Sequence, residues 1–273
     1  MTIMGPIWVF DSGYGGLTVL KEIRRRLPQY DYLYLWDNAR APYGSRSFET
    51  IFQYTWENVE KLFHKGCSLV ILACNTASAR ALREIQQKKL PLEYPDRRVL
   101  GVIRPTVEKI GLITKSRHIG ILATEWTVKS RAYDIEISHF YPDIVVNAVA
   151  CPLWVPLIEN NEYATPGARY FIEKYVGKLL EKDGEIDTII LGCTHYPLIQ
   201  DQIQEVVWEK IQVISQGEIV AESLEDYLFR HGEMDLQCSK KSWIQYFTTD
   251  SEEKFVSSAS LFLGEEIDAE KME

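Results

Sequence analysis

Residues 69–76 read LVILACNT, and residues 188–195 read TIILGCTH. In each stretch an apolar run ends in a small residue, a cysteine and two residues that can form hydrogen bonds. The two cysteines, Cys74 and Cys193, therefore stand at matching points of two similar segments. A short apolar run of this kind is typical of a buried strand in a parallel sheet. The repeat predicts a chain built from two similar halves, each with a thiol after one of its strands.

Outward from these stretches, short apolar runs alternate with longer amphipathic segments, which is typical of α/β architecture with parallel strands. Strands are expected at 7–10, 31–36, 69–73, 99–103, 118–122, 144–149, 188–191 and 243–247. Helices are expected at 17–27, 48–65, 77–89, 218–230 and from 252 onward. Each cysteine follows the third strand of its own series, which strengthens the inference of a repeat.

We therefore predict an α/β fold of two pseudo-symmetric, doubly wound parallel-sheet domains that face a central cleft. Three prolines between residues 91 and 105 mark the border between the halves. The first domain is expected to hold residues 1–100 and 213–273, and the second residues 101–212. The C-terminal part is assigned to the first domain because that half otherwise lacks a strand and a closing helix.

The composition excludes several classes of protein. The net charge of −9 over 273 residues argues against nucleic acid or an anionic membrane surface as the main partner. No apolar stretch approaches the ~20 residues needed to span a bilayer, and no export signal is recognisable. Five scattered cysteines fit free thiols in a reducing compartment better than a disulfide framework. We expect a cytoplasmic protein.

Polar or reactive residues stand at the carboxyl ends of five expected strands: Asp11, Asp37, Cys74, Thr124 and Cys193. Ligands of doubly wound sheets bind beyond these ends. A helix start after a cysteine favours the thiolate, and a thiol pKa of about 8.5 lets thiol and thiolate coexist near neutral pH. From the residues alone, catalytic and structural roles for these two thiols stay open. The remaining cysteines have no such setting and are assigned to packing: Cys67, Cys151 and Cys238.

Residues 11–16 read DSGYGG, and glycines after a strand let backbone amides approach an anion. A dinucleotide-binding turn would need a third glycine where Thr18 stands. The acid Asp11 would repel phosphate, and it suits an ammonium group or a neighbouring thiol or imidazole. His195 could protonate or position a substrate group. Its spacing from the cysteines is not that of a zinc site, so no metal is expected.

Two further segments are less informative by themselves. Residues 37–44 read DNARAPYG, which indicates a turn that carries an arginine. Residues 152–159 read PLWVPLIE, which is typical of a loop that caps a pocket. Without other information its last residue, Glu159, would be a solvated surface acid.

Together these segments resemble glutamate racemase, a family of cofactor-independent enzymes that supply D-glutamate for bacterial peptidoglycan. The resemblance is carried, in the family's order, by residues 9–17, 37–44, 73–78, 101–106, 152–159, 191–198 and 247–250. The sequence THYP at 194–197 favours glutamate over aspartate racemase. Trp36, Trp126 and residues 215–217 differ from the family pattern and leave the shape of the cleft rim open.

The resemblance implies interconversion of L-glutamate and D-glutamate with Cys74 and Cys193 as the two acid/base catalysts. It also implies that Asp11 and His195 assist the thiols and that Glu159 supports His195. The substrate would be held by residues from both halves: Ser12, Pro42, Tyr43, Gly44, Asn75, Thr76, Thr124 and Thr194. No cofactor is implied, and family members commonly form homodimers.

Three alternatives stay open. A racemase for aspartate or another amino acid would differ in which substrate turns over. A thiol hydrolase or transferase built on Cys193 and His195 would form a thioester and leave Cys74 without a role. A regulator that binds an amino acid would bind glutamate without turning it over.

Overall fold

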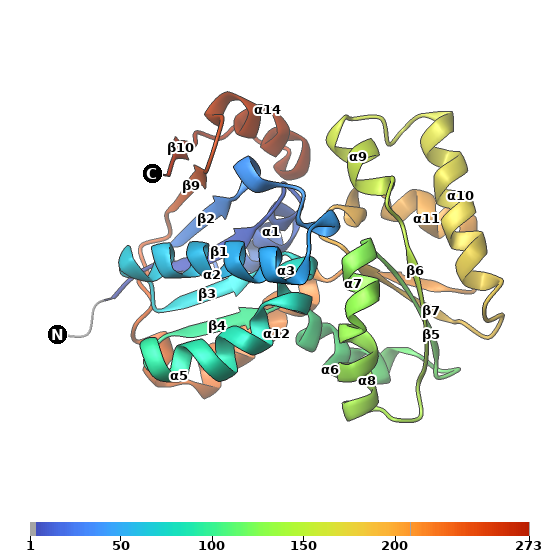
Figure 1. Ribbon diagram of the computed structural model, residues 1–273, viewed down its shortest axis with the longest axis horizontal. Helices are drawn as coiled ribbons and strands as arrows, with labels where there is room; N and C mark the ends of the chain where they lie inside the picture. Colours follow the sequence, from blue (N-terminus) through green and yellow to red (C-terminus); the bar gives the residue numbers. More distant parts are fainter. Residues whose placement is uncertain (1–3, 208, 273) are drawn as a thin grey trace.

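Two separate sheets organise the chain, and in both of them neighbouring strands run parallel. The computed structural model describes residues 4–207 and 209–272. The larger sheet has the order β10-β9-β2-β1-β3-β4 and the smaller β6-β5-β7-β8. The larger contains β1 (Ile7–Asp11), β2 (Tyr32–Trp36), β3 (Leu69–Leu72), β4 (Arg98–Gly101), β9 (Ile244–Thr248) and β10 (Glu270–Lys271). The smaller contains β5 (His118–Ala123), β6 (Val145–Ala150), β7 (Thr188–Gly192) and β8 (Gln212–Ile214). Each sheet together with its helices forms one body of the protein, called the larger and the smaller body, and Figure 1 shows the two bodies side by side.

The strand order contains the internal repeat. The first four strands along the chain lie in the order 2-1-3-4, and β6-β5-β7-β8 is the same order of ranks. The strand before Cys74 and the strand before Cys193 therefore hold equivalent places, β3 and β7. The predicted pair of pseudo-symmetric, doubly wound sheets is confirmed. The C-terminal part extends the larger sheet beside β2.

Helices cover the faces of both sheets. Those of the larger body are α1 (Gly16–Arg26), α2 (Phe48–His64), α3 (Asn75–Arg80), α4 (Leu82–Glu84), α5 (Leu90–Glu93), α12 (Gly217–Arg230), α13 (Gly232–Asp235) and α14 (Glu252–Leu263). Those of the smaller body are α6 (Ile103–Ile113), α7 (Glu125–Ser130), α8 (Ala132–Phe140), α9 (Trp154–Glu159), α10 (Pro166–Leu180) and α11 (Gln200–Val207). Among the pairs in contact, α1 packs on α12 and α14, α3 on α7, and α10 on β5 and β6.

Alternate residues of β1 enter two different cores. Ile7 and Val9 belong to the cluster that contains the apolar side of α1, whereas Trp8 and Phe10 belong to the cluster under α2. Both faces of the strand are covered by helices, so every position before Asp11 is apolar. This is the pattern of a buried parallel strand.

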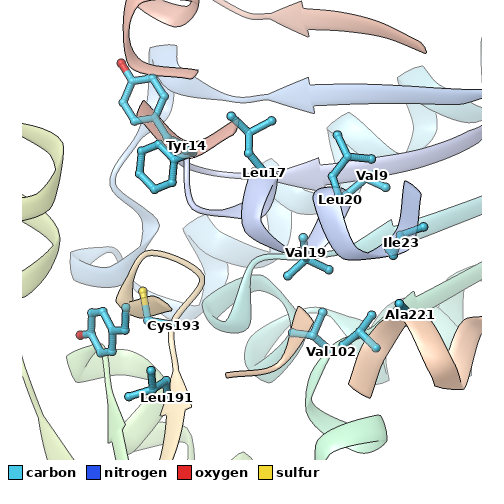
Figure 2. Close-up of a cluster of buried hydrophobic side chains, with 14 of the residues drawn as sticks. Val9, Tyr14, Leu17, Val19, Leu20, Ile23, Val102, Leu191, Cys193 and Ala221 are labelled. Carbon is cyan, nitrogen blue, oxygen red and sulfur yellow. The ribbon is translucent and has the colours of Figure 1, made fainter. Parts of the chain in front are cut away.

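One hydrophobic cluster joins the two bodies. Leu17, Leu20 and Ile23 recur at three-residue spacing on one side of α1, as helix geometry requires for packing on a sheet. The same cluster continues through Val102 to Cys193 at the end of β7, as Figure 2 shows. Burial of this shared surface holds the two sheets together and fixes the position of the second thiol relative to the first sheet.

Local signals explain where the long helix α2 begins and ends. The Ser47 hydroxyl accepts a hydrogen bond from Thr50 N at 3.3 Å and so caps the first turn. Gly66, with φ of 92°, follows the last turn in the left-handed conformation that glycine adopts easily. The predicted range, 48–65, is therefore close to the observed one.

Two predicted elements differ from the structure. The helix expected at 77–89 begins earlier, at Asn75, because Cys74 caps it, and it is divided into α3, α4 and a π-helical stretch over Ile85–Lys89. The strand expected at 99–103 ends at Gly101, because Ile103 already begins α6. Pro105 lies in the first turn of α6, where no intrahelical N–H bond is lost.

The chain crosses between the sheets twice. It leaves the larger sheet at Val102, between β4 and α6, and returns at Gln216, between β8 and α12. All five cysteines are buried and free. Within residues 4–207 and 209–272, no helix is both long and apolar enough to cross a membrane.

Candidate active site

The strand order defines one switch point in each sheet. From β1 the chain moves to β2 on one side, and from β3 to β4 on the other, so the direction reverses between β1 and β3. The same reversal separates β5 from β7. Asp11 ends β1 and Cys74 follows β3, while Thr124 follows β5 and Cys193 follows β7. These are the positions at which doubly wound sheets bind ligands.

The two switch points share one cavity of about 140 Å³. This is below the roughly 300–1,000 Å³ of sites for drug-sized ligands, and it suits a small metabolite rather than a dinucleotide. Every residue that the sequence analysis assigned to catalysis or substrate contact lines this cavity. Their roles stay predictions, because lining a cavity does not by itself establish chemistry. The cavity is also lined by Ser45 and Glu125, which the sequence did not single out, and by Gly13, Pro152 and Val155 from the segments described above. Cys151, which was assigned to packing, is a lining residue as well.

Cys74 lies at the start of α3, where its Sγ accepts from Ala77 N at 3.4 Å. Its other neighbour is Ser12, whose Oγ is 3.1 Å from Sγ. Burial, together with the negative charge of Asp11, raises the pKa of Cys74 to about 12. The two hydrogen bonds oppose that shift without cancelling it. In the free protein near neutral pH this thiol therefore keeps its proton.

Asp11 connects the two sheets. Its Oδ1 accepts from Gly13 N at 3.1 Å, and its Oδ2 accepts from the Thr194 hydroxyl at 2.9 Å. Burial raises its pKa, while the positive charge of His195 and these hydrogen bonds lower it. Burial is the larger effect, so the carboxyl holds its proton at higher pH than an exposed aspartate does.

Cys193, His195 and Glu159 form a row. His195 Nδ1 is 3.8 Å from Cys193 Sγ, and His195 Nε2 is 3.0 Å from Glu159 Oε1. Burial lowers the pKa of His195, but the interactions with Cys193 and Glu159 outweigh it and raise the pKa to about 10. A protonated imidazole beside Cys193 stabilises negative charge on that sulfur. Glu159 is thus no free surface acid, in contrast to the interpretation of its segment alone.

A helix start after each cysteine would favour the thiolate, but no α-helix begins directly after Cys193. A 3₁₀ turn at Tyr196–Ile199 precedes α11, which begins at Gln200. The two thiols therefore have different surroundings despite their equivalent places. Cys74 has a helix N-terminus and a serine, whereas Cys193 has a histidine.

The glycines of the DSGYGG turn allow close packing between the two bodies. A Cβ atom on Gly13 would lie 2.7 Å from Cε1 of His195, and one on Gly15 would lie 2.6 Å from the backbone nitrogen of His195. Any larger residue at either position would separate the histidine from the first sheet. The turn thus positions His195, and its glycines need no phosphate to explain them.

Asp37 organises the loop at residues 42–44. Its buried carboxylate accepts from the Tyr43 hydroxyl at 2.5 Å, Arg40 Nε at 2.8 Å and Asn58 Nδ2 at 2.8 Å. Thr249 from the C-terminal part donates to the other oxygen at 2.9 Å. These bonds hold Tyr43 and Gly44 against the cavity, so the DNARAPYG turn is a wall of the site and not only a turn.

The cleft rim accommodates both tryptophans outside the cavity. Trp36 is buried against Tyr14 and Phe255. Trp126 stacks with the Arg80 guanidinium, whose Cζ lies 5.1 Å from the ring centroid. Neither tryptophan is among the lining residues, so the cavity itself keeps the side chains expected from the sequence.

Chemically, the site offers two thiols that line one small cavity, one from each sheet. Hydroxyl and amide groups of Ser12, Asn75 and Thr194 line the same cavity. Such an arrangement can bring an acid/base group to each face of a small molecule. Among the described residues, no group of three or more His, Cys, Asp or Glu side chains is arranged to hold a metal ion.

The chain is similar to known racemases in both sequence and structure. A family model described as Asp/Glu/Hydantoin racemase matches residues 16–224. The glutamate racemase of Geobacter metallireducens is 39% identical over 258 residues, which cover 94% of this chain and 92% of that protein. A crystal structure of a glutamate racemase from Bacillus anthracis matches with a TM-score of 0.89 and 33% identity, over 98% of this chain and 97% of the other. The glutamate racemase of Francisella tularensis, solved in complex with D-glutamate, matches with a TM-score of 0.85 and 31% identity over 98% and 97%.

The chain belongs to the Asp/Glu/Hydantoin racemase family, and within it to the glutamate racemases.

Proposed function

We propose that this protein interconverts L-glutamate and D-glutamate with Cys74 and Cys193 as its two acid/base groups and with no organic cofactor. The observation that carries the proposal is the position of the two thiols. They follow equivalent strands of two facing sheets and line the same small cavity. Racemisation removes a proton from one face of the α-carbon and returns one to the other, and one base cannot easily reach both faces.

In the proposed mechanism one sulfur takes the α-proton as a thiolate. The electron pair of the broken C–H bond moves into the α-carboxylate, and the thiol on the opposite face then delivers its proton to the α-carbon. The raised pKa of Cys74, about 12, makes it the proton donor of the resting protein. Cys193, beside the protonated His195, is the base. The roles exchange when the other enantiomer enters.

The charge that develops on the substrate carboxylate needs hydrogen-bond donors. We assign this task to the cavity-lining polar groups of Ser12, Asn75, Thr76, Thr124 and Thr194 and to the backbone N–H groups of Tyr43 and Gly44, while Pro42, which has no N–H group, contributes only shape. Thr76 and Thr124 belong to different bodies, and their hydroxyl oxygens lie 3.0 Å apart. A substrate bound there would contact residues of both bodies.

The family resemblance supports three further proposals about the cell. The product D-glutamate supplies peptidoglycan synthesis, the protein works in the cytoplasm, and it acts as a homodimer. The cytoplasmic assignment agrees with five buried free thiols. One chain has a mass of 31.6 kDa, and light scattering of the purified protein should give twice this mass if it is a dimer.

Circular dichroism of L-glutamate and of D-glutamate, each incubated with the purified protein and no added cofactor, tests the reaction. Both signals should decay to zero. Decay of the aspartate signals but not of the glutamate signals would show that aspartate is the substrate. Binding of glutamate without decay of either signal would favour a regulator. Repeating the assay in D₂O tests the two bases. Early in the reaction the product should carry deuterium at the α-carbon, and the recovered substrate should carry none.

A further inference from the structure

The amide of Asn75 is paired at one end only. Asn75 directly follows Cys74, lines the cavity and is 2% exposed. Its Oδ1 accepts a hydrogen bond from the Tyr133 hydroxyl at 2.8 Å. Its Nδ2 has no hydrogen-bond partner within the described part of the chain. A buried donor without an acceptor destabilises a protein, so this N–H group is suited to meet an oxygen of a bound ligand.

Tyr133 in turn is held by Gln216. Tyr133 lies on α8 of the smaller body, and Gln216 lies where the chain returns to the larger one. Gln216 Nε2 donates to the Tyr133 hydroxyl at 2.8 Å. The same nitrogen contacts Val102 O at 3.1 Å and Thr106 Oγ1 at 2.8 Å, next to the other crossing of the chain. All these side chains are buried.

One backbone carbonyl fixes which group donates at each step of the hydrogen-bond chain from Gln216 through Tyr133 to Asn75, called the relay below. Val102 O can only accept, so the NH₂ end of the Gln216 amide must face it. This NH₂ group also faces the Tyr133 hydroxyl, which therefore accepts from Gln216 and keeps its own proton to donate. The proton goes to Asn75 Oδ1, and Nδ2 is left as the unpaired end. A flipped Asn75 amide would place two donors, O–H and N–H, against each other.

We propose that Tyr133 and Gln216 are positioning residues that orient the Asn75 amide so that Nδ2 donates to a carboxylate oxygen of the substrate. The inference rests on the proposed function for the identity of that substrate. A rotated amide would present Oδ1 to the carboxylate and repel it. The relay also connects both crossings of the chain to a substrate contact, so the relative placement of the two bodies and the orientation of this donor depend on each other.

Tyr133→Phe removes the hydroxyl and keeps the ring. The expected result is a fall in kcat/KM for L-glutamate of about tenfold, mainly through KM, because a misoriented amide weakens substrate binding. Tyr141→Phe is the matched control. The Tyr141 hydroxyl donates to Glu108 O at 2.8 Å, also beside α8 but away from the cavity, and its loss should leave kcat/KM within about twofold.

A double-mutant cycle separates positioning from general damage. On an Asn75→Ala background the group to be positioned is gone, so Tyr133→Phe should produce no further change in KM. Gln216→Met provides a second, independent variant that keeps the hydroxyl of Tyr133 but loses the amide that directs it. It should raise KM less than Tyr133→Phe and also have no effect on the Asn75→Ala background.

Wild-type turnover is measured first, because its absence would remove the proposed function, and with it the substrate on which the inference depends. If the wild type is active, the variants test only the positioning role of Tyr133 and Gln216. It is overturned if Tyr133→Phe behaves like Tyr141→Phe, or if the loss is as large without the Asn75 amide as with it.

Discussion

Nε2 of His195 lies 3.0 Å from Oε1 of Glu159, although the two residues are 36 positions apart in the chain. The histidine follows β7 and the glutamate ends α9, so the contact forms only when the smaller body is folded. The Glu159 side chain is 29% exposed and that of His195 is 7% exposed. The pair thus lies at the boundary of the cavity, where a carboxylate from the rim holds a proton on a buried imidazole.

We predict that Glu159→Gln lowers stability in a pH-dependent way. The pKa of His195 is raised from 6.5 to about 10, so its contribution to stability is complete below about pH 6.5 and is lost as the pH rises to about 10. The wild type should therefore exceed the variant in free energy of unfolding by about 1 kcal/mol near pH 6.5, a value kept small because Glu159 is partly exposed. Urea unfolding at several pH values measures the difference, which should shrink toward pH 10.

The same substitution should lower kcat about tenfold near pH 8, because the imidazolium that stabilises charge on Cys193 becomes less favourable. Asp183→Asn is the control. Asp183 Oδ2 is 2.8 Å from His118 Nδ1, a comparable pair outside the cavity. An equal loss of activity in both variants would mean that the effect of Glu159 is structural.

Replacing either cysteine of the cavity should abolish net racemisation. A serine hydroxyl is a far weaker acid than a thiol, so we expect kcat to fall by about 10³-fold or more in Cys74→Ser and in Cys193→Ser. Cys238→Ser makes the same change at a buried site away from the cavity and should retain activity. Near-normal turnover of both enantiomers by either cavity variant would exclude the two-thiol mechanism. Circular dichroism with each enantiomer gives the measurement.

We also predict that Thr194→Val shifts the acid limb of the pH–activity profile to higher pH. The Thr194 hydroxyl donates to Asp11 Oδ2 at 2.9 Å and so lowers the pKa of that carboxyl. Without this hydrogen bond, less counteracts the effect of burial on the Asp11 carboxyl, so the pKa of Asp11 rises further. Thr55→Val removes another buried threonine hydroxyl, which donates to Ile51 O at 2.7 Å, and it should leave the profile in place. A profile of kcat/KM against pH distinguishes the two.

Much of this fold could be predicted from the sequence because buried parallel strands are apolar at nearly every position. β3 is apolar throughout and β7 is apolar from Ile189 to Leu191, and the matching cysteine motifs that follow them indicate the repeat. The helices of the smaller body, α6 to α11, were not predicted, although α7 and α10 each begin with a capping threonine, Thr124 and Thr165. Pro166 after Thr165 is a further start signal. The buried positions of α10 recur at helical spacing, at Ala168, Ile172, Tyr175, Val176 and Leu179, so this helix could have been predicted, whereas α7 is too short to show a period.

The site residues could be predicted from local motifs, but their contacts could not. Ser12 beside Cys74 and Thr194 beside Asp11 join segments 62 and 183 positions apart. The first pair depends on β1 and β3 lying side by side in one sheet, and the second depends on how the two sheets face each other. No local pattern encodes either arrangement. The partners of Asn75 are the clearest case. Tyr133 belongs to no motif in the sequence and Gln216 stood out only as a departure from the family pattern, so only their hydrogen bonds connect them to the cavity.

Asp37→Asn should destabilise the fold far more than removal of the other acid that contacts Arg40. Arg40 donates to Asp37, which is fully buried, and to Glu57, whose side chain is 42% exposed. Loss of the buried carboxylate leaves the guanidinium without its inner partner and weakens the hydrogen bond from Tyr43. We expect Asp37→Asn to lower the free energy of unfolding by about 3 kcal/mol. Glu57→Gln should cost less than about 1 kcal/mol, because water replaces an exposed partner.

Urea unfolding of both variants gives the comparison, and glutamate turnover gives a second readout. Because Asp37 holds the loop of Tyr43 and Gly44 against the cavity, Asp37→Asn should also raise KM for glutamate at temperatures where the protein stays folded. Glu57→Gln should leave KM unchanged. Equal losses of stability in the two variants would show that burial of Asp37 adds nothing, and the loop would then owe its position to packing alone.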